Sequence, residues 1–579
     1  MSVDPERLLG ALDPEQRAVA TTMGVPVCVL AGAGTGKTRA LTHRIAYGVA
    51  SGDYSPSRVM ALTFTTRAAA ELRSRLAELG AERAQARTFH SAALAQLNHF
   101  WPQLTGAGAP SVIDSKARTI ADAAKRLNIP LDVATARDVA ALIEWRKVRR
   151  ISLRSLEAEL GTVRALPGRL SIEHAMTLLA GYESLKDERK QIDFEDVLVL
   201  TAGMLADEPV VADQVREQYR HFLVDEYQDV SPIQQELLEL WLGERRELCV
   251  VGDASQTIYS FAGASPNYLL DFQRRYPEAE LIRLERNYRS RPEIVAHANE
   301  LMRGRPGALR LRAERSSGAA PRALRYANDQ AEAEAVASEI AQAIAEGANP
   351  DDFAVLYRMN AQSQALEQAL AARSVPYRVR GGVPFYERPE IRQALMQLRA
   401  EALSDTGGRP LFQIVSDVLW SLGWNTQPPE AAGAVRERWE SLNVLATLAD
   451  AAPAGTRIGA FVQQQRAKAE IGAEPALGAV TLATIHSAKG LEWNRVFVIG
   501  LCEGLLPVSY ASGAEAIEEE RRLMYVAITR ARDELSLSWA AAGQRGAREP
   551  SRFLEECRSR SSDASAPDSA DAGRQRSAP

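Results

Sequence analysis

The octapeptide AGAGTGKT occupies positions 31–38 and follows the apolar run 25–30. A helical pattern begins near Lys37, so this glycine-rich segment lies between an expected strand and an expected helix. In that context, glycines let successive backbone N–H groups turn inward and form an anion-binding nest at a helix N-terminus. Lys37 adds charge for the β- and γ-phosphates, and the Thr38 hydroxyl is placed to hold Mg²⁺. The stretch predicts a nucleoside triphosphate site in an α/β fold, rather than a turn that binds nothing.

Length and composition describe a globular protein of several folding units. The 579 residues are too many for one core, and 46% hydrophobic and 25% charged residues are ordinary values. The net charge of −5 leaves nucleic-acid binding open, because a basic groove can lie on an acidic protein. The basic clusters 146–150 and 303–315 are candidates for such a groove, or for plain solvated surface.

The sequence gives no indication of export or membrane insertion. Its start is acidic, without the basic and apolar regions of a signal peptide, and no apolar run reaches the ~18 residues of a membrane span. The four cysteines have no CxxC spacing, which predicts buried thiols and no zinc site. We therefore expect a cytoplasmic protein.

Strand and helix patterns alternate twice along the chain. Expected strands lie at 25–30, 58–64, 221–226, 247–253, 323–326, 353–357, 377–379, 479–485, 495–501 and 534–540. Several end in polar residues, as strands of a parallel α/β sheet do at their functional edge. Helical patterns interrupt both series, at 96–205 and 389–475. The expected fold class is α/β, with two α/β domains that each carry a mainly helical insertion.

Two adjacent carboxylates end one of these strands, in VDEYQD at 224–229. Asp225 is placed to bind Mg²⁺ through water, and Glu226 to orient and deprotonate an attacking water. Such a pair also occurs as plain surface residues, but the glycine-rich loop favours the catalytic interpretation. Because a kinase has no need of a water-activating glutamate, hydrolysis is favoured over transfer to a substrate.

The segment VVGDASQTIYSFAGA at 250–264 combines polar and aromatic residues. Gln256 is placed to sense the γ-phosphate, while Tyr259 and Phe261 offer flat surfaces for bases. Aromatic residues near a loop usually belong to a core, but these two stand among small residues that bury little.

Three later segments supply further polar candidates. LERNYRSRPEI (284–294) offers Tyr288 and Arg289, HSAKGLEW (486–493) offers His486, Lys489 and Glu492, and a helical segment ends near Arg530. Each alone is compatible with a surface residue or a turn. Their order along the chain is the informative feature.

In this order, the chain from about residue 10 to 556 resembles superfamily 1A DNA helicases of the UvrD/Rep/PcrA family. The matching segments are LDPEQRAV (12–19), TFTTRAAAEL (63–72), TFHS (88–91), DFEDVL (193–198), YRMNAQS (357–363), HSAKGLE (486–492) and EERRLMYVAITRAR (519–532). Ala31 departs from the strict phosphate-loop pattern but matches the AGAG form of this family.

The resemblance implies a nucleotide site shared by two domains. Arg289 and Arg530 are the implied arginine fingers; Arg39 and Tyr288 sandwich adenine, and Glu492 contacts ribose. The implied ATP-binding positions are Gln16, Ala31, Gly32, Ala33, Gly34, Thr35, Gly36, Lys37, Thr38, Arg39, Tyr288 and Glu492. The implied catalytic positions are Lys37, Asp225, Glu226, Gln256, Arg289 and Arg530, with Thr38 and Asp225 holding Mg²⁺.

The resemblance also implies a channel for single-stranded DNA. Its implied positions are Phe64, Thr65, His90, Phe194, Tyr259, Phe261, Arg358, Asn360 and His486. Aromatic rings suit stacking on bases, and arginine suits the backbone charge. Ala262 stands where the family usually has arginine, and no aromatic is found near Gly546, where a channel aromatic is often present.

By the same resemblance, the domains are two RecA-like P-loop motor domains with insertions. The expected ranges are 1–95 with 206–283 for the first motor (1A), 96–205 for its insertion (1B), 284–388 with 476–556 for the second motor (2A), 389–475 for a short insertion (2B), and 557–579 for a disordered tail. The short 2B resembles a UvrD-type subgroup whose longer members add a four-cysteine linker and an HRDC domain, neither of which follows Arg552 here.

The implied activity is an ATP-dependent 3′–5′ helicase acting in repair or recombination. The alternative is a single-stranded DNA translocase that displaces proteins or needs a repair-protein partner to unwind. A nucleotide-regulated binding protein without a motor is disfavoured, because Glu226 and both arginines are present. The implied ligands are ATP, Mg²⁺ and single-stranded DNA or its junction with duplex, for a monomer at the nucleoid.

Overall fold

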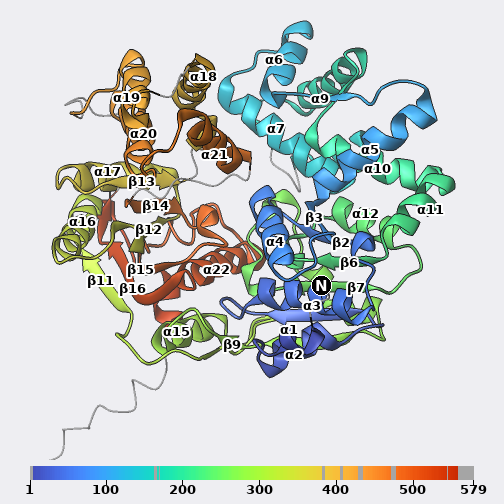
Figure 1. Cartoon of the computed structure of the whole chain (residues 1–579), viewed down its shortest axis with the longest axis horizontal. Coiled ribbons are helices and arrows are strands. Elements are labelled where there is room, and N and C mark those ends of the chain that lie inside the picture. The colour runs from blue at the N-terminus through green and yellow to red at the C-terminus, as the bar shows by residue number, and fades with distance from the viewer. Residues whose placement is uncertain are drawn as a thin grey trace, which may run out of the picture. The chain divides into compact units, whose positions relative to one another are not determined.

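The computed structural model describes residues 4–161, 166–168, 170–380, 385–404, 408–427, 434–470, 478–543 and 546–557. The chain divides into two compact units, Met1–Glu285 with Arg380–Ala479, and Arg286–Val379 with Val480–Pro579. Two six-stranded sheets dominate the fold, with helices packed on them (Figure 1). The predicted α/β class with parallel sheets is confirmed. The predicted domain boundaries stay a prediction.

The sheet of the first unit is parallel throughout. Its strand order is β3-β2-β6-β7-β1-β8. The strands are β1 (Val27–Ala31), β2 (Val59–Thr63), β3 (Gln85–Thr88), β6 (His221–Val224), β7 (Leu248–Gly252) and β8 (Glu280–Leu284). In register, Leu62 pairs with Val224, and Val29 pairs with Val251. Since all strands run the same way, their carboxyl ends lie along one edge.

Helices cover both faces of this sheet. Val29 and Val251 face a core that includes Leu41 and Leu72, whereas Val250, on the opposite face, belongs to a core with the helices that carry Phe89 and Trp241. This alternation is the period of two that a strand buried on both faces requires. The helices are α1 (Pro5–Leu9), α2 (Pro14–Thr21), α3 (Lys37–Ser51), α4 (Thr66–Glu78), α5 (Phe89–Thr105), α12 (Pro232–Leu242), α13 (Asn267–Leu270) and α14 (Phe272–Arg275).

A mainly helical region separates β3 from β6. It contains α6 (Lys116–Arg126), α7 (Val133–Val148), α8 (Leu153–Glu159), α9 (Ile172–Glu188), α10 (Phe194–Asp207), α11 (Pro209–Gln218) and the two-residue strands β4 (Ser111–Val112) and β5 (Gln191–Ile192). Helices α6 to α9 share their own core around Ile143 and Tyr182. Helix α10 instead packs Leu198 and Leu205 into a core of the large sheet. The region therefore adjoins the sheet through α10.

The second unit has a sheet of order β11-β16-β15-β12-β14-β13. Its strands are β11 (Arg322–Tyr326), β12 (Phe353–Tyr357), β13 (Tyr377–Arg380), β14 (Val480–Thr484), β15 (Trp493–Val498) and β16 (Ala531–Ala540), and the pairings of β11, β12, β14, β15 and β16 are parallel. Its helices are α15 (Pro292–Met302), α16 (Asp329–Ala345), α17 (Ser363–Ala371), α22 (Ala514–Ile528) and α23 (Arg552–Glu556). Two-residue strands are β9 (Arg286–Asn287), β10 (Arg312–Ala313), β17 (Ala542–Gly543) and β18 (Gly546–Ala547).

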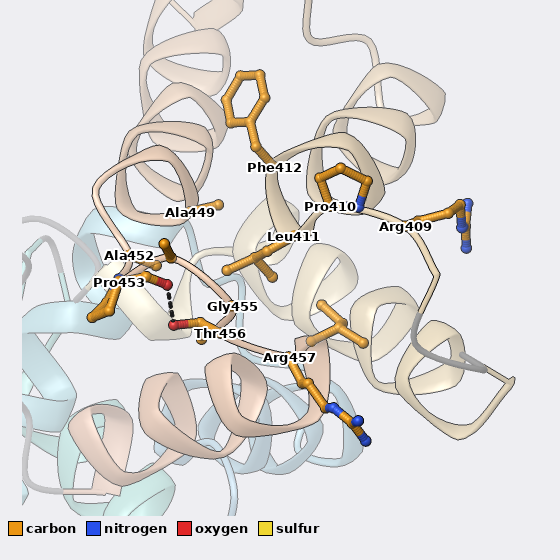
Figure 2. Close-up of a pocket in the computed structure, with 12 residues that line it drawn as sticks. Arg409, Pro410, Leu411, Phe412, Ala449, Ala452, Pro453, Gly455, Thr456 and Arg457 are labelled. Atoms are coloured by element: carbon orange, nitrogen blue, oxygen red, sulfur yellow. Dashed lines mark hydrogen bonds between the residues drawn. The ribbon is translucent and has the colours of Figure 1, made fainter.

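Four further helices, between β13 and β14, build a separate core. They are α18 (Pro389–Ser404), α19 (Leu411–Ser421), α20 (Ala434–Asp450) and α21 (Ile458–Glu470), and they bury Leu398, Leu419, Leu445 and Phe461 together. A pocket of about 310 Å³ lies where the turn after α20 meets the start of α19 (Figure 2). Thr456 closes that turn by donating from Oγ1 to the Pro453 carbonyl at 2.6 Å.

Short 3₁₀ helices mark several loops that matter below. They are η1 (Pro56–Arg58), η2 (Tyr227–Asp229), η3 (Ala254–Gln256), η4 (Ser260–Ala262), η5 (Pro350–Asp352), η6 (Asn360–Gln362), η7 (Phe385–Glu387) and η8 (His486–Ala488). Four of them, η2, η3, η6 and η8, begin two or three positions after the last residue of β6, β7, β12 and β14 respectively.

All ten predicted strands are present within a few residues of their expected bounds. Strands β3 and β8 of the first sheet were missed, as were the two-residue strands. The cysteines are buried free thiols, as predicted, and burial raises the pKa of Cys28 and Cys557 to about 12.

No helix in the described ranges is long and apolar enough to cross a membrane. Of the predicted tail, Cys557 ends α23 in a buried position, and 558–579 lies outside the described residues.

Candidate nucleotide and nucleic-acid sites

The glycine-rich loop joins β1 to α3 as predicted. Gly36, the N-cap residue of α3, has φ 78°, a left-handed conformation that favours glycine. A Cβ atom there would lie 2.7 Å from Nε2 of Gln16. Gln16 itself donates to the carbonyl of Thr35 at 3.0 Å, and Thr35 Oγ1 donates to that of Gly32 at 2.8 Å. The loop is therefore braced from α2, with the N-terminus of α3 at its end, where an anion is favoured.

Directly after β6, Asp225 and Glu226 form the predicted carboxylate pair. Glu226 adopts a left-handed backbone conformation with φ 53°, which costs a non-glycine residue of order 1–3 kcal/mol and is typical of functional sites. Lys37 Nζ lies 3.3 Å from Glu226 Oε1. Burial lowers the pKa of Lys37, but Glu226, Asp253 and Asp225 outweigh it, so the net shift is upward and Lys37 keeps its charge. Burial, followed by repulsion from Glu226, raises the pKa of Asp225 to about 7.

Gln228 connects this pair to the neighbouring strand, a role that sequence reasoning missed. Its Nε2 donates to Glu226, and its Oε1 accepts the backbone N–H of Asp253 at 2.9 Å. Asp253 Oδ2 in turn accepts from Nε2 of Gln256 at 2.7 Å. Hydrogen bonds thus run from the end of β6 to the end of β7. The sequence signal that could have found this role is the glutamine two residues after Glu226 in VDEYQD, a polar residue that the structure buries.

Two exposed phenylalanine rings, each beside a half-buried aromatic ring, lie near the same sheet edge. His90, in the first turn of α5, stacks on Phe194, the first residue of α10, with ring centroids 3.9 Å apart and an 11° interplanar angle. Tyr259 and Phe261 meet edge to face at 6.1 Å. Phe194 and Phe261 are 55% and 59% exposed, values that a hydrophobic core does not explain. Phe194 and Phe261 are therefore available on the surface of this unit, with His90 and Tyr259 half-buried beside them.

Two predicted DNA contacts have a structural duty as well. Phe64 is half-buried against the core around Phe89, with ring centroids 6.2 Å apart. Thr65 caps α4 by accepting the N–H of Ala68 at 3.1 Å. Their contact with DNA stays a prediction.

The strand order arranges these groups in sequence along one edge. The series starts at β1, beside the edge strand β8, and crosses the sheet through β7, β6 and β2 to the other edge, β3. In that order, the segments after the strands are the glycine-rich loop and those with Gln256, the carboxylate pair, Phe64 and His90. Side chains suited to phosphate thus lie next to side chains suited to bases. Ligands bind at this edge in open α/β sheets.

In the second unit, the predicted nucleotide residues gather where β15 and β16 begin. Glu492 precedes β15 and Arg530 precedes β16. Arg289 Nε donates to Glu492 at 2.5 Å, and its Nη1 donates to the Thr529 carbonyl at 3.2 Å. Arg530 is 1% exposed and donates from Nη1 to the Leu491 carbonyl at 3.1 Å. Tyr288 presents a ring that is 43% exposed.

The predicted DNA residues of this unit lie at the opposite end of the same sheet. Arg358 and Asn360 follow β12, and His486 follows β14. Arg358 pairs with Glu520, as described below, while Asn360 is exposed at the start of η6. Burial, then the charges of Arg358 and Lys489, lowers the pKa of His486 to about 4. Nucleotide and DNA candidates are thus separated along the strands.

One part of the basic cluster at 146–150 is not a solvated surface. Lys147 is 4% exposed and Arg146 pairs with Glu183 at 2.8 Å, whereas Arg149 and Arg150 are exposed.

The predicted nucleotide residues are divided between the two units. The first unit holds Lys37, Thr38, Asp225, Glu226 and Gln256, and the second holds Tyr288, Arg289, Glu492 and Arg530. That they complete a single nucleotide site stays a prediction.

A glycine-rich loop between a parallel strand and a helix, with carboxylates on a neighbouring strand, defines a P-loop nucleotide-binding protein. The model of the UvrD/REP helicase N-terminal domain matches residues 12–277, and that of the UvrD-like helicase C-terminal domain matches 282–407 and 446–542. The chain therefore belongs to the UvrD/REP helicase family, which confirms the resemblance drawn from its motifs.

Individual relatives cover nearly the whole chain. It is 44% identical to ATP-dependent DNA helicase UvrD2 of Mycobacterium tuberculosis over 580 residues, 96% of this chain and 82% of the relative. It is 32% identical to DNA helicase II of Haemophilus influenzae over 96% of this chain and 88% of that protein. It is also 30% identical to ATP-dependent DNA helicase PcrA of Staphylococcus aureus, over 95% of this chain and 86% of that protein.

Proposed function

We propose that this protein is an ATP-dependent 3′–5′ DNA helicase that hydrolyses ATP to move on single-stranded DNA and unwind duplex. The observation that carries the proposal is the shared sheet edge, where the phosphate loop and the carboxylate pair lie beside the exposed aromatic rings. Relatives at 30–44% identity are named DNA helicases, which supports the same activity. In this proposal the two sheets are RecA-like motor domains 1A and 2A, with the helical regions as insertions 1B and 2B.

ATP binding is assigned to the loop at 31–38 and its surroundings. The N–H groups at the start of α3 and the ammonium of Lys37 bind the phosphates, braced by Gln16. Mg²⁺, when bound, neutralises phosphate charge, and Thr38 with Asp225 would hold it. Asp225 fits that duty, because it is a buried carboxylate whose pKa is raised to about 7 and which a cation would stabilise. Arg39 and Tyr288 take the adenine and Glu492 the ribose.

Hydrolysis is assigned to Glu226 as the base that orients and deprotonates water. Its carboxylate is fixed by Lys37 and by the amide of Gln228. Gln256, tied to Asp253, reports on the γ-phosphate. Arg289 and Arg530 from the second motor domain neutralise the charge on the transferring phosphoryl group. The rate of hydrolysis then depends on how the two domains close, which couples the chemistry to movement.

DNA binding is assigned to the two exposed phenylalanines with their aromatic neighbours, and to the carboxyl ends of β12 and β14. His90, Phe194, Tyr259 and Phe261 stack on bases, and Phe64 and Thr65 line the channel behind them. Arg358, Asn360 and His486 contact the strand from domain 2A. The substrate is a single strand or its junction with duplex, in repair or recombination of the chromosome. We accordingly place the protein at the nucleoid in the cytoplasm, as a monomer.

A second function is favoured by the small size of the helical region α18–α21, which the resemblance marks as a short 2B. In that case the motor translocates on single-stranded DNA and displaces proteins, or unwinds only with a repair-protein partner. Both functions need the same ATPase and the same grip on DNA.

One set of assays separates these functions. ATP hydrolysis is measured with and without oligo(dT), and strand displacement on duplexes with a 3′ or a 5′ tail. A helicase of 3′–5′ polarity shows stimulated hydrolysis and displaces only the 3′-tailed duplex. Stimulation without displacement supports the translocase. If oligo(dT) leaves the ATPase rate unchanged, both motor functions are wrong.

A further inference from the structure

Five charged side chains meet inside the helical region of the first unit. Lys147 of α7 and Lys186 of α9 face three carboxylates, those of Glu183, Asp193 and Asp196; we call these five the buried charge cluster. Both lysines and Asp193 are at most 4% exposed. Burying ions costs several kcal/mol each unless they are paired, and an apolar replacement is often at least as stable. The cluster is therefore poorly explained as a stabilising device.

The pairing within the cluster is tight. Lys147 Nζ lies 2.6 Å from both Asp193 Oδ2 and Asp196 Oδ1, and Lys186 contacts Asp196 and lies 2.7 Å from Glu183. Tyr182 donates its hydroxyl to Asp193 at 2.9 Å. Burial raises the pKa of Asp193, but the two lysines outweigh it and hold the net pKa well below its usual range, so the carboxylate stays charged.

The two aspartates are also the capping box of α10. Asp193 Oδ1 accepts the N–H of Asp196 at 2.9 Å, and Asp196 Oδ2 accepts the N–H of Asp193 at 3.0 Å. Phe194 stands between them as the first residue of the helix, 55% exposed and stacked on His90. Its ring has little burial of its own to fix it. The orientation of the ring therefore depends on the first turn of α10, which the lysines hold.

The same cluster adjoins the second aromatic pair. Lys147 is followed by Val148, the last residue of α7, which lies against the loop that carries Tyr259 and Phe261. A Cβ atom on Gly263 would come within 2.6 Å of Val148 Cγ1, so the loop and the helix end approach as closely as glycine allows. A displaced α7 would thus disturb both the start of α10 and this loop.

We propose that the buried charge cluster is a positioning device for base stacking: Lys147 and Lys186 lock the start of α10 so that Phe194 and His90 meet single-stranded DNA as a preformed platform. The inference deepens the proposed function, since it rests on the DNA role of Phe194. Preformed geometry saves the ordering cost that a mobile ring would incur on binding. The lysines act through Phe194 and touch no DNA themselves.

The test is a double-mutant cycle between Lys186 and Phe194. For the full-length protein, Lys186→Met, Phe194→Ala and the double variant are compared by oligo(dT)-stimulated ATP hydrolysis. We expect Lys186→Met to raise the oligo(dT) concentration at half-maximal stimulation about tenfold, within the range for losing one stacked base. The DNA-free ATPase rate stays within about twofold of wild type, since the nucleotide residues are untouched. In the Phe194→Ala background, Lys186→Met adds less than about twofold, because both act through one ring.

Two further variants keep the test decisive. Tyr182→Phe removes one hydrogen bond to Asp193 without leaving an unpaired charge, so it replaces Lys186→Met if that variant fails to fold. We expect Tyr182→Phe to raise the oligo(dT) concentration at half-maximal stimulation two- to threefold, which corresponds to the loss of one modest hydrogen bond. In the Phe194→Ala background this rise is absent. Arg126→Met is the matched control: it breaks an exposed ion pair with Glu188 between α6 and α9, 2.6 Å long, and leaves half-saturation unchanged.

The outcomes distinguish the role of the buried charge cluster from the DNA-binding role of Phe194, on which it rests. If Phe194→Ala leaves half-saturation unchanged, the DNA role of Phe194 is wrong, and the inference falls with it. If Phe194→Ala weakens binding while the folded Lys186→Met or Tyr182→Phe variants bind as wild type, only the inference is overturned. It is overturned as well if the effects of Lys186→Met and Phe194→Ala on half-saturation simply multiply.

Discussion

Arg358 forms a bidentate ion pair with Glu520, in which Nε and Nη2 donate to the carboxylate at 3.1 and 2.8 Å. The side chain of Glu520 is 5% exposed and also accepts the N–H of Val508 at 3.2 Å. Arg358 thus has two duties: it balances a buried carboxylate, and in our proposal it offers charge to a DNA phosphate. A single substitution cannot tell the two apart.

A paired substitution separates stability from DNA binding at this site. Arg358→Met leaves Glu520 charged and unpaired, which we expect to cost about 3–5 kcal/mol of stability. In Arg358→Met/Glu520→Gln the charge is gone and the amide oxygen still accepts from Val508, so stability returns. DNA affinity stays low, and the slope of log affinity against log salt falls by about 0.7, the share of one phosphate on a single strand. Wild-type affinity and slope in the double variant would contradict the DNA contact.

The sequence predicted the buried, apolar strands of the fold, and it missed the two edge strands of the first sheet. Strands β3 and β8 are the two edges of the first sheet, and polar or charged residues interrupt their short sequences, QART and ELIRL, so neither is a continuous apolar run. The phosphate loop, by contrast, was readable because its glycines and lysine are required locally. Edge strands carry no such requirement.

Among site residues, the sequence indicated single side chains but not the links between them. Gln228 was passed over because its partners, Glu226 and the N–H of Asp253, lie on separate strands that only the sheet order brings together. Lys147 was assigned with a basic surface cluster because its carboxylate partners come about 40 residues later. Long-range pairing of charges is not visible in local patterns.

Glu226→Gln is expected to keep ATP binding and lose turnover. The amide is nearly isosteric with the carboxylate and its oxygen still accepts from Gln228, so the loop keeps its shape. Without a base, we expect kcat to fall by about 10²–10⁴-fold. Binding of a fluorescent ATP analogue and DNA-stimulated hydrolysis are measured together, with Lys37→Ala as the control that loses binding. An active Glu226→Gln enzyme would mean that the base is assigned wrongly.

Gln228→Met tests the hydrogen bonds that connect β6 with β7. The substitution keeps the volume but leaves the buried N–H of Asp253 without its acceptor, at a cost of about 1–3 kcal/mol. We expect kcat to fall about tenfold, since Glu226 and Gln256 lose their common alignment, while the dissociation constant for ATP changes little. Thermal unfolding and the two kinetic constants are the measurements. Gln235→Met, a buried glutamine on α12 that bonds Tyr227, is the control and leaves kcat unchanged. An unchanged kcat in Gln228→Met would show that the connection has no part in hydrolysis.

Two histidines should make the fold sensitive to mild acid. Burial lowers the pKa of His90 to about 4, and the pKa of His486 is lowered to a similar value. In the unfolded chain both take up protons near pH 6.5, so the unfolded state binds more protons between about pH 4 and 6.5. Their contribution to stability is therefore complete above about pH 6.5 and is lost as the pH falls toward 4. Between pH 7.5 and 5.5, one such histidine accounts for about 1.4 kcal/mol.

The measurement is the apparent Tm at pH 7.5 and 5.5 for wild type, His90→Phe and His486→Asn. Phenylalanine keeps a ring against Phe194 but cannot titrate, so we expect the drop in Tm on acidification to be smaller in His90→Phe than in wild type. Asp225 has the opposite effect on stability: because its pKa is raised in the folded protein, acidification stabilises the fold through this group. Wild type and variant share this effect, so comparing their drops in Tm between the same two pH values removes it. His174→Asn changes an exposed histidine of α9 and should keep the wild-type drop. An equal drop in His90→Phe would mean that His90 is not held neutral in the folded chain.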